Sequence, residues 1–201
     1  MSADEGGRKL LAAARRELHA HFGLDPVAEV GMDFEWTLPL GGVFATLELE
    51  GELRGCIGYF HRGEDILSLT RRAVVAAALD DPRFGRVSRE EVPRLAISIT
   101  VLAPPVAIAD PSEVVIGRDG LLIKRGSSRG LLLPQVAVRR GWDSEIFLEE
   151  TCRKAGLPVD AWRDGVTVVR RFEAVHFEEE SRTENREPRT DLPPARHPDD
   201  F

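Results

Sequence analysis

The chain has 201 residues, which suits one domain or two small lobes with a substantial core. Its formal net charge is −7, of which residues 178–201 carry −4, so the rest of the chain is nearly balanced and has no basic stripe of the kind that binds nucleic acid. No apolar run reaches the length of a signal peptide or a membrane span, so the sequence predicts a cytoplasmic protein without membrane contact.

The first predicted element is an amphipathic helix over about residues 7–22. Apolar residues recur there at three- and four-residue spacing, and Gly23 follows as a C-terminal cap. His19 and His21 lie two positions apart on this helix, hence on different faces, and do not form a metal-binding pair. Residues 25–40 mix proline, glycine and acidic residues with aromatics, which indicates an irregular segment that packs onto the next element.

A hairpin follows, built from residues 43–49 and a second strand that starts at Leu53. We interpret residues 50–52 as a three-residue loop with glycine in the left-handed conformation, because a two-residue loop at Glu50 and Gly51 would mix the polar and apolar faces. This register pairs Leu49 with Leu53, Leu47 with Gly55 and Ala45 with Ile57 on one apolar face, and Glu48 with Arg54 and Thr46 with Cys56 on the other.

Residues 53–58, with the sequence Leu-Arg-Gly-Cys-Ile-Gly, form the candidate functional stretch. Gly55 and Gly58 are candidate ligand-binding positions, since glycine inside a strand marks a bulge or a close approach by a ligand or another chain. Arg54 and Cys56 leave the same face roughly 7 Å apart at the backbone, and a guanidinium at that distance can stabilise a thiolate. The alternative is a structural cysteine, with Arg54 paired to Glu48.

The central helix is predicted from Ile66 to about Leu79, where a wide apolar stripe contains several alanines that permit close packing. Pro82 marks its end, because the residue before a proline disfavours helical angles. Arg83 then lies in a loop, where it either contacts an anion or is simply solvated. Residues 95–102 alternate as a strand and end before two prolines.

The second half of the chain contains a further predicted hairpin, with strands at residues 114–116 and 121–123 around the turn signal Asp119-Gly120. Residues 126–130 resemble an anion-binding nest but lack the lysine of a phosphate loop, so a plain turn between strands is favoured. A short helix begins at Pro134 and runs through Val138.

Asp143 is a natural N-cap for a helix over residues 144–155, and Cys152 lies on its apolar face as a packing residue. Residues 165–177 alternate as a final strand. Residues 178–201 hold four prolines and few apolar residues, so they are predicted to form a disordered acidic tail.

Four motifs occur in the order that is typical of the AMMECR domain family, known in bacteria and archaea as AmmeMemoRadiSam system protein A. They are residues 53–58, 81–84, 130–143 and 151–158, and the resemblance covers about residues 8–177. It implies an α+β fold with a mixed, largely antiparallel sheet, packed helices and two unequal lobes. It also implies Memo-like and radical SAM proteins as possible partners, since the genes often lie side by side.

Two functions from different classes remain open. In the first, the protein is an accessory module that binds a ligand or a partner, with Gly55, Gly58 and Arg83 as contact residues. In the second, it is an enzyme in which Cys56 is the nucleophile and Arg54 assists it. The binding module is favoured, because His61 would lie roughly 16 Å from Cys56 along an extended strand and no other base can be assigned. The sequence identifies no metal site and no cofactor.

Overall fold

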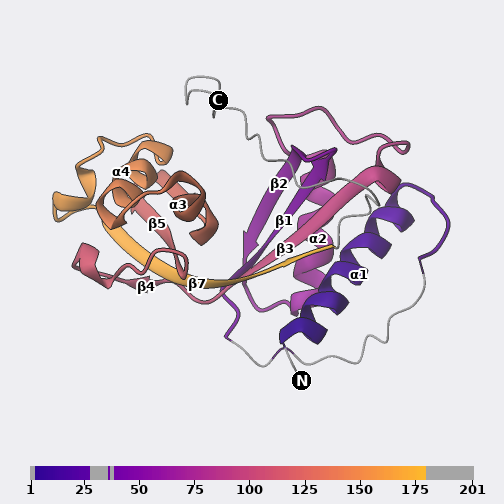
Figure 1. Cartoon of the computed structure of the whole chain (residues 1–201), viewed down its shortest axis with the longest axis horizontal. Helices are drawn as coiled ribbons and strands as arrows, with labels where there is room; N and C mark the ends of the chain where they lie inside the picture. Colours follow the sequence, from indigo (N-terminus) through magenta and orange to yellow (C-terminus); the bar gives the residue numbers. More distant parts are fainter. Residues whose placement is uncertain (1–2, 28–35, 37–38, 180–201) are drawn as a thin grey trace.

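A single antiparallel sheet runs through both lobes of the protein (Figure 1). The computed structural model describes residues 3–27, 36 and 39–179. The strand order is β2-β1-β3-β7-β5-β6, and the short strand β4 also pairs with β7. The strands are β1 (Gly42–Leu49), β2 (Glu52–Phe60), β3 (Leu95–Leu102), β4 (Val106–Ala107), β5 (Asp119–Arg125), β6 (Ser128–Leu132) and β7 (Val168–Glu178).

The first and larger lobe packs two helices against one face of β2, β1, β3 and the end of β7. These helices are α1 (Ala3–His21) and α2 (Ile66–Leu79), and both lie on the same side of the strands (Figure 1). Asp65 begins α2 by accepting a hydrogen bond from the backbone N–H of Ser68 (2.9 Å). The fully buried core of this lobe includes Leu10, Leu18, Leu47, Leu69, Leu95, Ile97 and Ile99.

The second lobe packs α3 (Pro134–Arg140) and α4 (Ser144–Lys154) against β5 and β6, and Val169 of β7 joins the core of this lobe. As the sequence predicts, Asp143 caps α4, with its carboxylate accepting from the N–H of Ile146 (2.9 Å). Cys152 is fully buried in the core of this lobe, as predicted, and burial raises the pKa of its thiol. Three short 3₁₀ turns complete the described chain: η1 (Val92–Arg94), η2 (Pro111–Glu113) and η3 (Ala161–Arg163).

The tip of the β1–β2 hairpin differs from the predicted three-residue loop. Glu50 and Gly51 form a two-residue turn with positive φ angles of 57° and 85°. The register then shifts between Leu47 and Glu48, which leaves Arg54 as the extra residue of a bulge and places Leu53 opposite Glu48. The predicted pairing of Glu48 with Arg54 is therefore wrong, whereas the predicted pairs from Gly55 onward are confirmed.

The hairpin predicted around Asp119-Gly120 is also wrong, because both residues belong to β5. The turn lies instead at Gly126 and Ser127, between β5 and β6. Residues 114–116 form no strand. The favoured interpretation of residues 126–130 as a turn between strands is confirmed.

The last described residues, Glu178 and Glu179, are attached to the first lobe. Glu178 belongs to β7, and the carboxylate of Glu179 binds the buried guanidinium of Arg15 and the backbone N–H of Ile97 (3.1 Å). The prediction of a disordered tail otherwise falls on residues 180–201, which lie outside the described residues. Within the described part of the chain, no helix has the length and apolar character needed to cross a membrane.

Candidate functional site

Gly55 faces helix α2, on the helix-covered side of the sheet. A Cβ atom at this position would lie 2.0 Å from the backbone oxygen of Ala77, so only glycine lets the helix come this close. The close approach that the sequence predicts at Gly55 is thus made by α2 and leaves no space there for a ligand.

Cys56 faces the opposite side of the sheet, which neither α1 nor α2 covers. Its cross-strand partner is Thr46, whose hydroxyl donates to the sulfur atom (Oγ1 to Sγ 3.3 Å). Thr46 is in turn paired with Ser98 of β3, and Ser98 with Glu178 of β7, so these four residues form one row across the sheet. The thiol is partly exposed in a polar surface strip, in contrast to the fully buried Cys152.

Asp81 and Arg83 bind the backbone of Cys56 along the free edge of β2. The Asp81 carboxylate accepts from the Cys56 N–H (2.8 Å) and from the Arg83 guanidinium (2.8 and 3.0 Å). Arg83 in turn donates to the Cys56 carbonyl oxygen (3.4 Å). The hydrogen bond from Arg83 lowers the pKa of Asp81 to about 2, and the pKa of Arg83 is raised chiefly by Asp81, with a smaller contribution from Cys56.

Arg54 points away from Cys56 and holds the loop that leads into η1. Its guanidinium binds the Glu91 carboxylate (2.8 and 3.1 Å) and the backbone oxygens of Gly85 (2.7 Å) and Arg86 (3.0 Å). The hydrogen bond from Arg54 lowers the pKa of Glu91 to about 2. With these four contacts the bulge residue of β2 stabilises a loop, and the predicted alternative pairing with Glu48 does not occur.

No described residue stands in the position of a general base for Cys56. His176 shares the same sheet face, but it belongs to β7, three strands away, where its Nδ1 lies 3.0 Å from the hydroxyl of Thr100. Asp81 is bound to the Cys56 backbone, and a carboxylate with a pKa of about 2 is a poor proton acceptor. Among the described residues, no group of three potential ligands is arranged to hold a metal ion.

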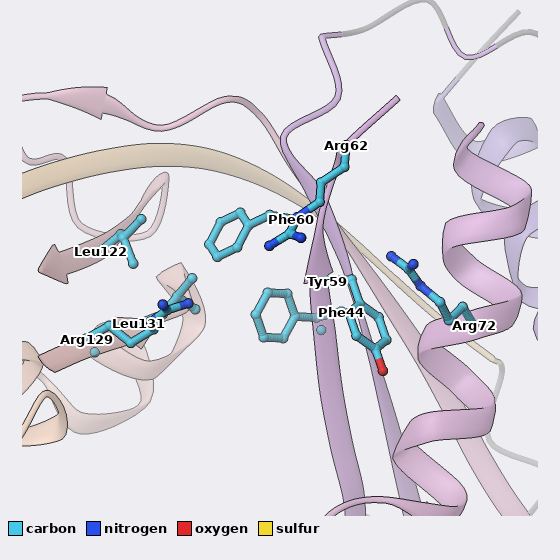
Figure 2. A pocket seen from close by; sticks show the side chains of 10 residues that line it. Phe44, Tyr59, Phe60, Arg62, Arg72, Leu122, Arg129 and Leu131 are labelled. Atoms are coloured by element: carbon cyan, nitrogen blue, oxygen red, sulfur yellow. The ribbon is translucent and has the colours of Figure 1, made fainter. Parts of the chain in front are cut away.

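A pocket of about 460 Å³ lies between the two lobes, next to the end of β2 (Figure 2). The first lobe contributes the aromatic residues and two arginines, and β5 and β6 contribute the opposite wall. The lining residues are Phe44, Gly58, Tyr59, Phe60, Arg62, Arg72, Leu122, Arg129, Gly130 and Leu131. Of the five candidate site residues that the sequence names, Gly58 lines this pocket, whereas Cys56, Arg54, Gly55 and Arg83 lie outside its lining.

Gly58 shapes the pocket floor through the ring of Phe44. A Cβ atom at Gly58 would lie 2.3 Å from that ring, so the missing side chain lets Phe44 lie flat across the neighbouring strand. Cys56 precedes Gly58 by two positions on the same face, roughly 7 Å away along the strand. The pocket and the polar strip around Cys56 are therefore neighbours on one surface.

The pocket is positively charged, although the chain as a whole carries −7. The guanidinium carbon of Arg72 lies 4.3 Å from the ring centroid of Tyr59. The same guanidinium forms an ion pair with the Glu64 carboxylate (N to O 2.7 Å). Within the described structure, the side chains of Arg62 and Arg129 make no hydrogen bond and no ion pair. Arg129 lies in the glycine- and serine-rich stretch that resembles an anion-binding nest, which is the one sequence signal that points toward this site.

The geometry is that of a two-lobed α+β protein with a cationic pocket between its lobes. The chain belongs to the AMMECR1 family, whose model matches residues 11–177. Protein TK0174 of Thermococcus kodakarensis is 44% identical over 188 residues, covering 88% of this chain and 92% of that protein. A protein of Methanothermobacter thermautotrophicus is 42% identical over 187 residues, covering 90% and 97%.

The fold has an experimental counterpart. The crystal structure of the uncharacterized protein PH0010 from Pyrococcus horikoshii matches with a TM-score of 0.77 at 40% sequence identity, covering 88% of this chain and 93% of that chain. The family and the α+β fold predicted from the four motifs are both confirmed.

Proposed function

We propose that the protein is a binding module without catalytic activity of its own, and that its ligand occupies the pocket between the lobes. The observation that carries this proposal is the composition of the pocket lining. None of the ten lining residues is serine, threonine, cysteine, histidine, aspartate, glutamate or lysine, which supply most enzymatic nucleophiles and acid–base groups. Such a pocket desolvates and orients a ligand but has little means to transform it.

The fluorescent probe anilinonaphthalene sulfonate tests this pocket, because it combines apolar rings with one negative charge. We expect saturable binding at one site, and strong loss of binding when Leu122→Glu places a carboxylate in the lining. The control is Val166→Glu, which adds the same charge at a residue that is 71% exposed and outside the pocket. Equal binding by both variants would show that the probe binds elsewhere and would contradict the proposal.

The accessory role extends the same proposal to partner proteins. The resemblance to AmmeMemoRadiSam system protein A supports Memo-like and radical SAM proteins as the partners that would deliver or receive the ligand. Purified proteins from one genome, mixed and examined by analytical ultracentrifugation, test this role. We expect a complex with at least one of the two proteins, and the failure of both to bind at high concentration would remove this part of the proposal.

A thiol enzyme is the second candidate, and one observation favours it. Cys56 is partly exposed, and its sulfur lies in electrostatic reach of Arg83, a residue on the adjoining loop. In this candidate Cys56 is still the nucleophile, while the assisting role expected of Arg54 passes to Arg83, because Arg54 is held by Glu91. The lack of a base near Cys56 makes the binding module the better-supported function.

A further inference from the structure

We infer that the pocket between the lobes selects ligands that carry a phosphate group on a planar apolar body, with Arg62 and Arg129 holding the phosphate. This inference rests on the proposed binding function and names the chemical class of its ligand. Three features support it: the positions of the two arginines, the lack of a carboxylate that pairs with them, and the flat apolar surfaces of the lining.

The two arginines approach the pocket from different lobes. Arg62 follows the end of β2 in the first lobe, whereas Arg129 belongs to β6 in the second. Figure 2 shows both side chains directed into the space between the lobes, with Arg62 above Phe60 and Arg129 beside Leu131. A ligand that binds both guanidinium groups would therefore bridge the lobes.

The charge of these two arginines is uncompensated, as it also is at exposed arginines such as Arg139 and Arg140, but among the described residues only Arg62 and Arg129 combine this with a place in the pocket lining. Arg54, Arg83 and Arg118 each pair with a carboxylate. Arg72, the third arginine of the pocket, is paired with Glu64. Since the ten lining residues include no carboxylate, Arg62 and Arg129 leave two positive charges for a ligand to neutralise.

A phosphate monoester matches this arrangement better than a carboxylate does. It carries close to two negative charges at neutral pH and three terminal oxygens, so it can accept from two guanidinium groups at once. A single carboxylate has two oxygens and one charge, which one arginine satisfies in a bidentate pair. Two unpaired guanidinium groups on facing walls thus favour the dianion.

The remaining lining is apolar and offers flat surfaces. The rings of Phe44 and Phe60 lie on one side, with Leu122 and Leu131 on the other (Figure 2). Aromatic rings favour offset or edge contacts with another ring, and a volume of about 460 Å³ is within the usual range for small-molecule sites. The lining has no amide or hydroxyl side chain apart from the Tyr59 phenol, so it recognises a class of ligand rather than one pattern of ring substituents.

Four related probes distinguish binding by the two arginines from binding by the apolar lining. Naphthyl phosphate has both the ring and the dianion, naphthol has only the ring, naphthoate has the ring with a carboxylate, and inorganic phosphate has only the anion. We expect titration calorimetry to show naphthyl phosphate binding at least about tenfold more tightly than each of the other three, with an affinity that falls as salt is added. Equal affinities for naphthyl phosphate and naphthol would overturn the inference and leave the binding function standing.

Arginine variants locate the anion. Arg62→Gln and Arg129→Gln should each weaken naphthyl phosphate by about tenfold and leave naphthol unchanged, because each removes one charge-assisted contact. Arg139→Gln is the matched control, an exposed arginine on α3 outside the lining, and should bind like the wild type. The inference is wrong if the control loses as much affinity as the pocket variants.

The same samples distinguish a failure of the inference from a failure of the proposed function. Naphthyl phosphate should stay intact during the titration, since the only nucleophilic group in the lining is the Tyr59 phenol, and no lining carboxylate, imidazole or amine can deprotonate it. Release of free naphthol by the wild type, but not by Arg129→Gln, would uphold recognition of the phosphate and overturn the proposal of a module without catalytic activity.

Discussion

The carboxylate of Asp81 occupies the position where a neighbouring strand would bind Cys56. It accepts the hydrogen bond from the outward-facing N–H of Cys56 at 2.8 Å, and Arg83, held by the same carboxylate, reaches the Cys56 carbonyl. β2 is the last strand of the sheet order, so these backbone groups would otherwise form an open edge. Residues 81–84 thus cover the open edge of β2 at residues 53–58, so that these two motifs are in direct contact.

Removing the Asp81 carboxylate should destabilise the fold. We expect Asp81→Ala to lower the free energy of unfolding by about 2 to 3 kcal/mol, because it leaves the Cys56 N–H and Arg83 without their partner. Urea denaturation measures the loss. Asp80→Ala, which changes the adjacent and exposed carboxylate, serves as the control, and a similar loss in both variants would show that the edge contact contributes little.

Acid should destabilise the protein partly through Asp81 and Glu91. Both have a pKa of about 2 in the folded protein, below their ordinary values of 3.8 and 4.5, since each accepts hydrogen bonds from an arginine. A depressed pKa contributes stability that is fully present above the unfolded value and is lost as the pH falls through the folded value. We expect the urea midpoint to fall as the pH drops from about 5 to about 2.

The variants Asp81→Asn and Glu91→Gln isolate these two groups from the other carboxylates. Each should be less stable than the wild type at neutral pH and should lose less stability on acidification, so that the curves converge near pH 2. Curves that run parallel to the wild type over the whole range would exclude both groups as the source of the acid sensitivity.

The packing of α2 against β2 predicts that even one added methyl group at Gly55 is harmful. Gly55→Ala places a Cβ atom 2.0 Å from the backbone oxygen of Ala77, and a backbone atom of a packed helix cannot move aside cheaply. We expect a loss of about 3 kcal/mol or more in the free energy of unfolding. Gly85→Ala is the control, because a Cβ atom there meets nothing within 4 Å and the backbone is not left-handed.

The contact between Glu179 and Arg15 should stabilise the end of the fold. Arg15 is 5% exposed and also donates to the backbone oxygens of Val92 (2.9 Å) and Leu95 (2.6 Å), so Glu179→Ala leaves a buried cation without its carboxylate. We expect a loss of about 3 kcal/mol, measured by thermal or urea unfolding. Glu178→Ala, at a side chain that is 76% exposed, should change the stability by less than about 0.5 kcal/mol.

The two cysteines should differ in their rate of alkylation. Partly exposed Cys56 should react with iodoacetamide at neutral pH much faster than Cys152, whose thiol is fully buried and has a raised pKa. Mass spectrometry of one sample gives both rates. If Arg83 activates the thiol, Arg83→Gln should slow the labelling of Cys56 more than Arg54→Gln does, whereas equally slow labelling of both cysteines in the wild type would remove the thiol-enzyme candidate.

Elements with local signals were predictable from the sequence. The predicted helix over residues 66–79, the strand over residues 95–102 and the cap at Asp143 all match the structure, because periodicity and capping depend on neighbours in the chain. Asp119 and Gly120 show where such local reasoning fails. Together they resemble a hairpin turn, yet the Asp119 carboxylate is fully buried among arginines and a backbone N–H.

The site was less predictable than the fold, because its contacts join distant segments. The sequence marks Gly55 and Gly58 as unusual for a strand, but the atoms that occupy their open sides belong to α2 and to Phe44. The glycine- and serine-rich stretch around Arg129 gives a weak signal and Arg62 gives none, and only the packing of the two lobes brings the two arginines to one pocket. The sequence predicts a role for Arg54 beside Cys56, because the bulge that turns Arg54 toward Glu91 leaves no local signature.

Strand β7 makes the two lobes inseparable as folding units. Its consecutive residues Glu173 and Ala174 pair with different lobes, Glu173 with Asp119 of β5 and Ala174 with Leu102 of β3. A fragment that ends after β3 would lack the strand that covers the edge of its sheet, and that exposed edge favours aggregation. The first lobe should therefore fold only when a second fragment supplies β7, so that two separately expressed pieces would restore the protein by complementation.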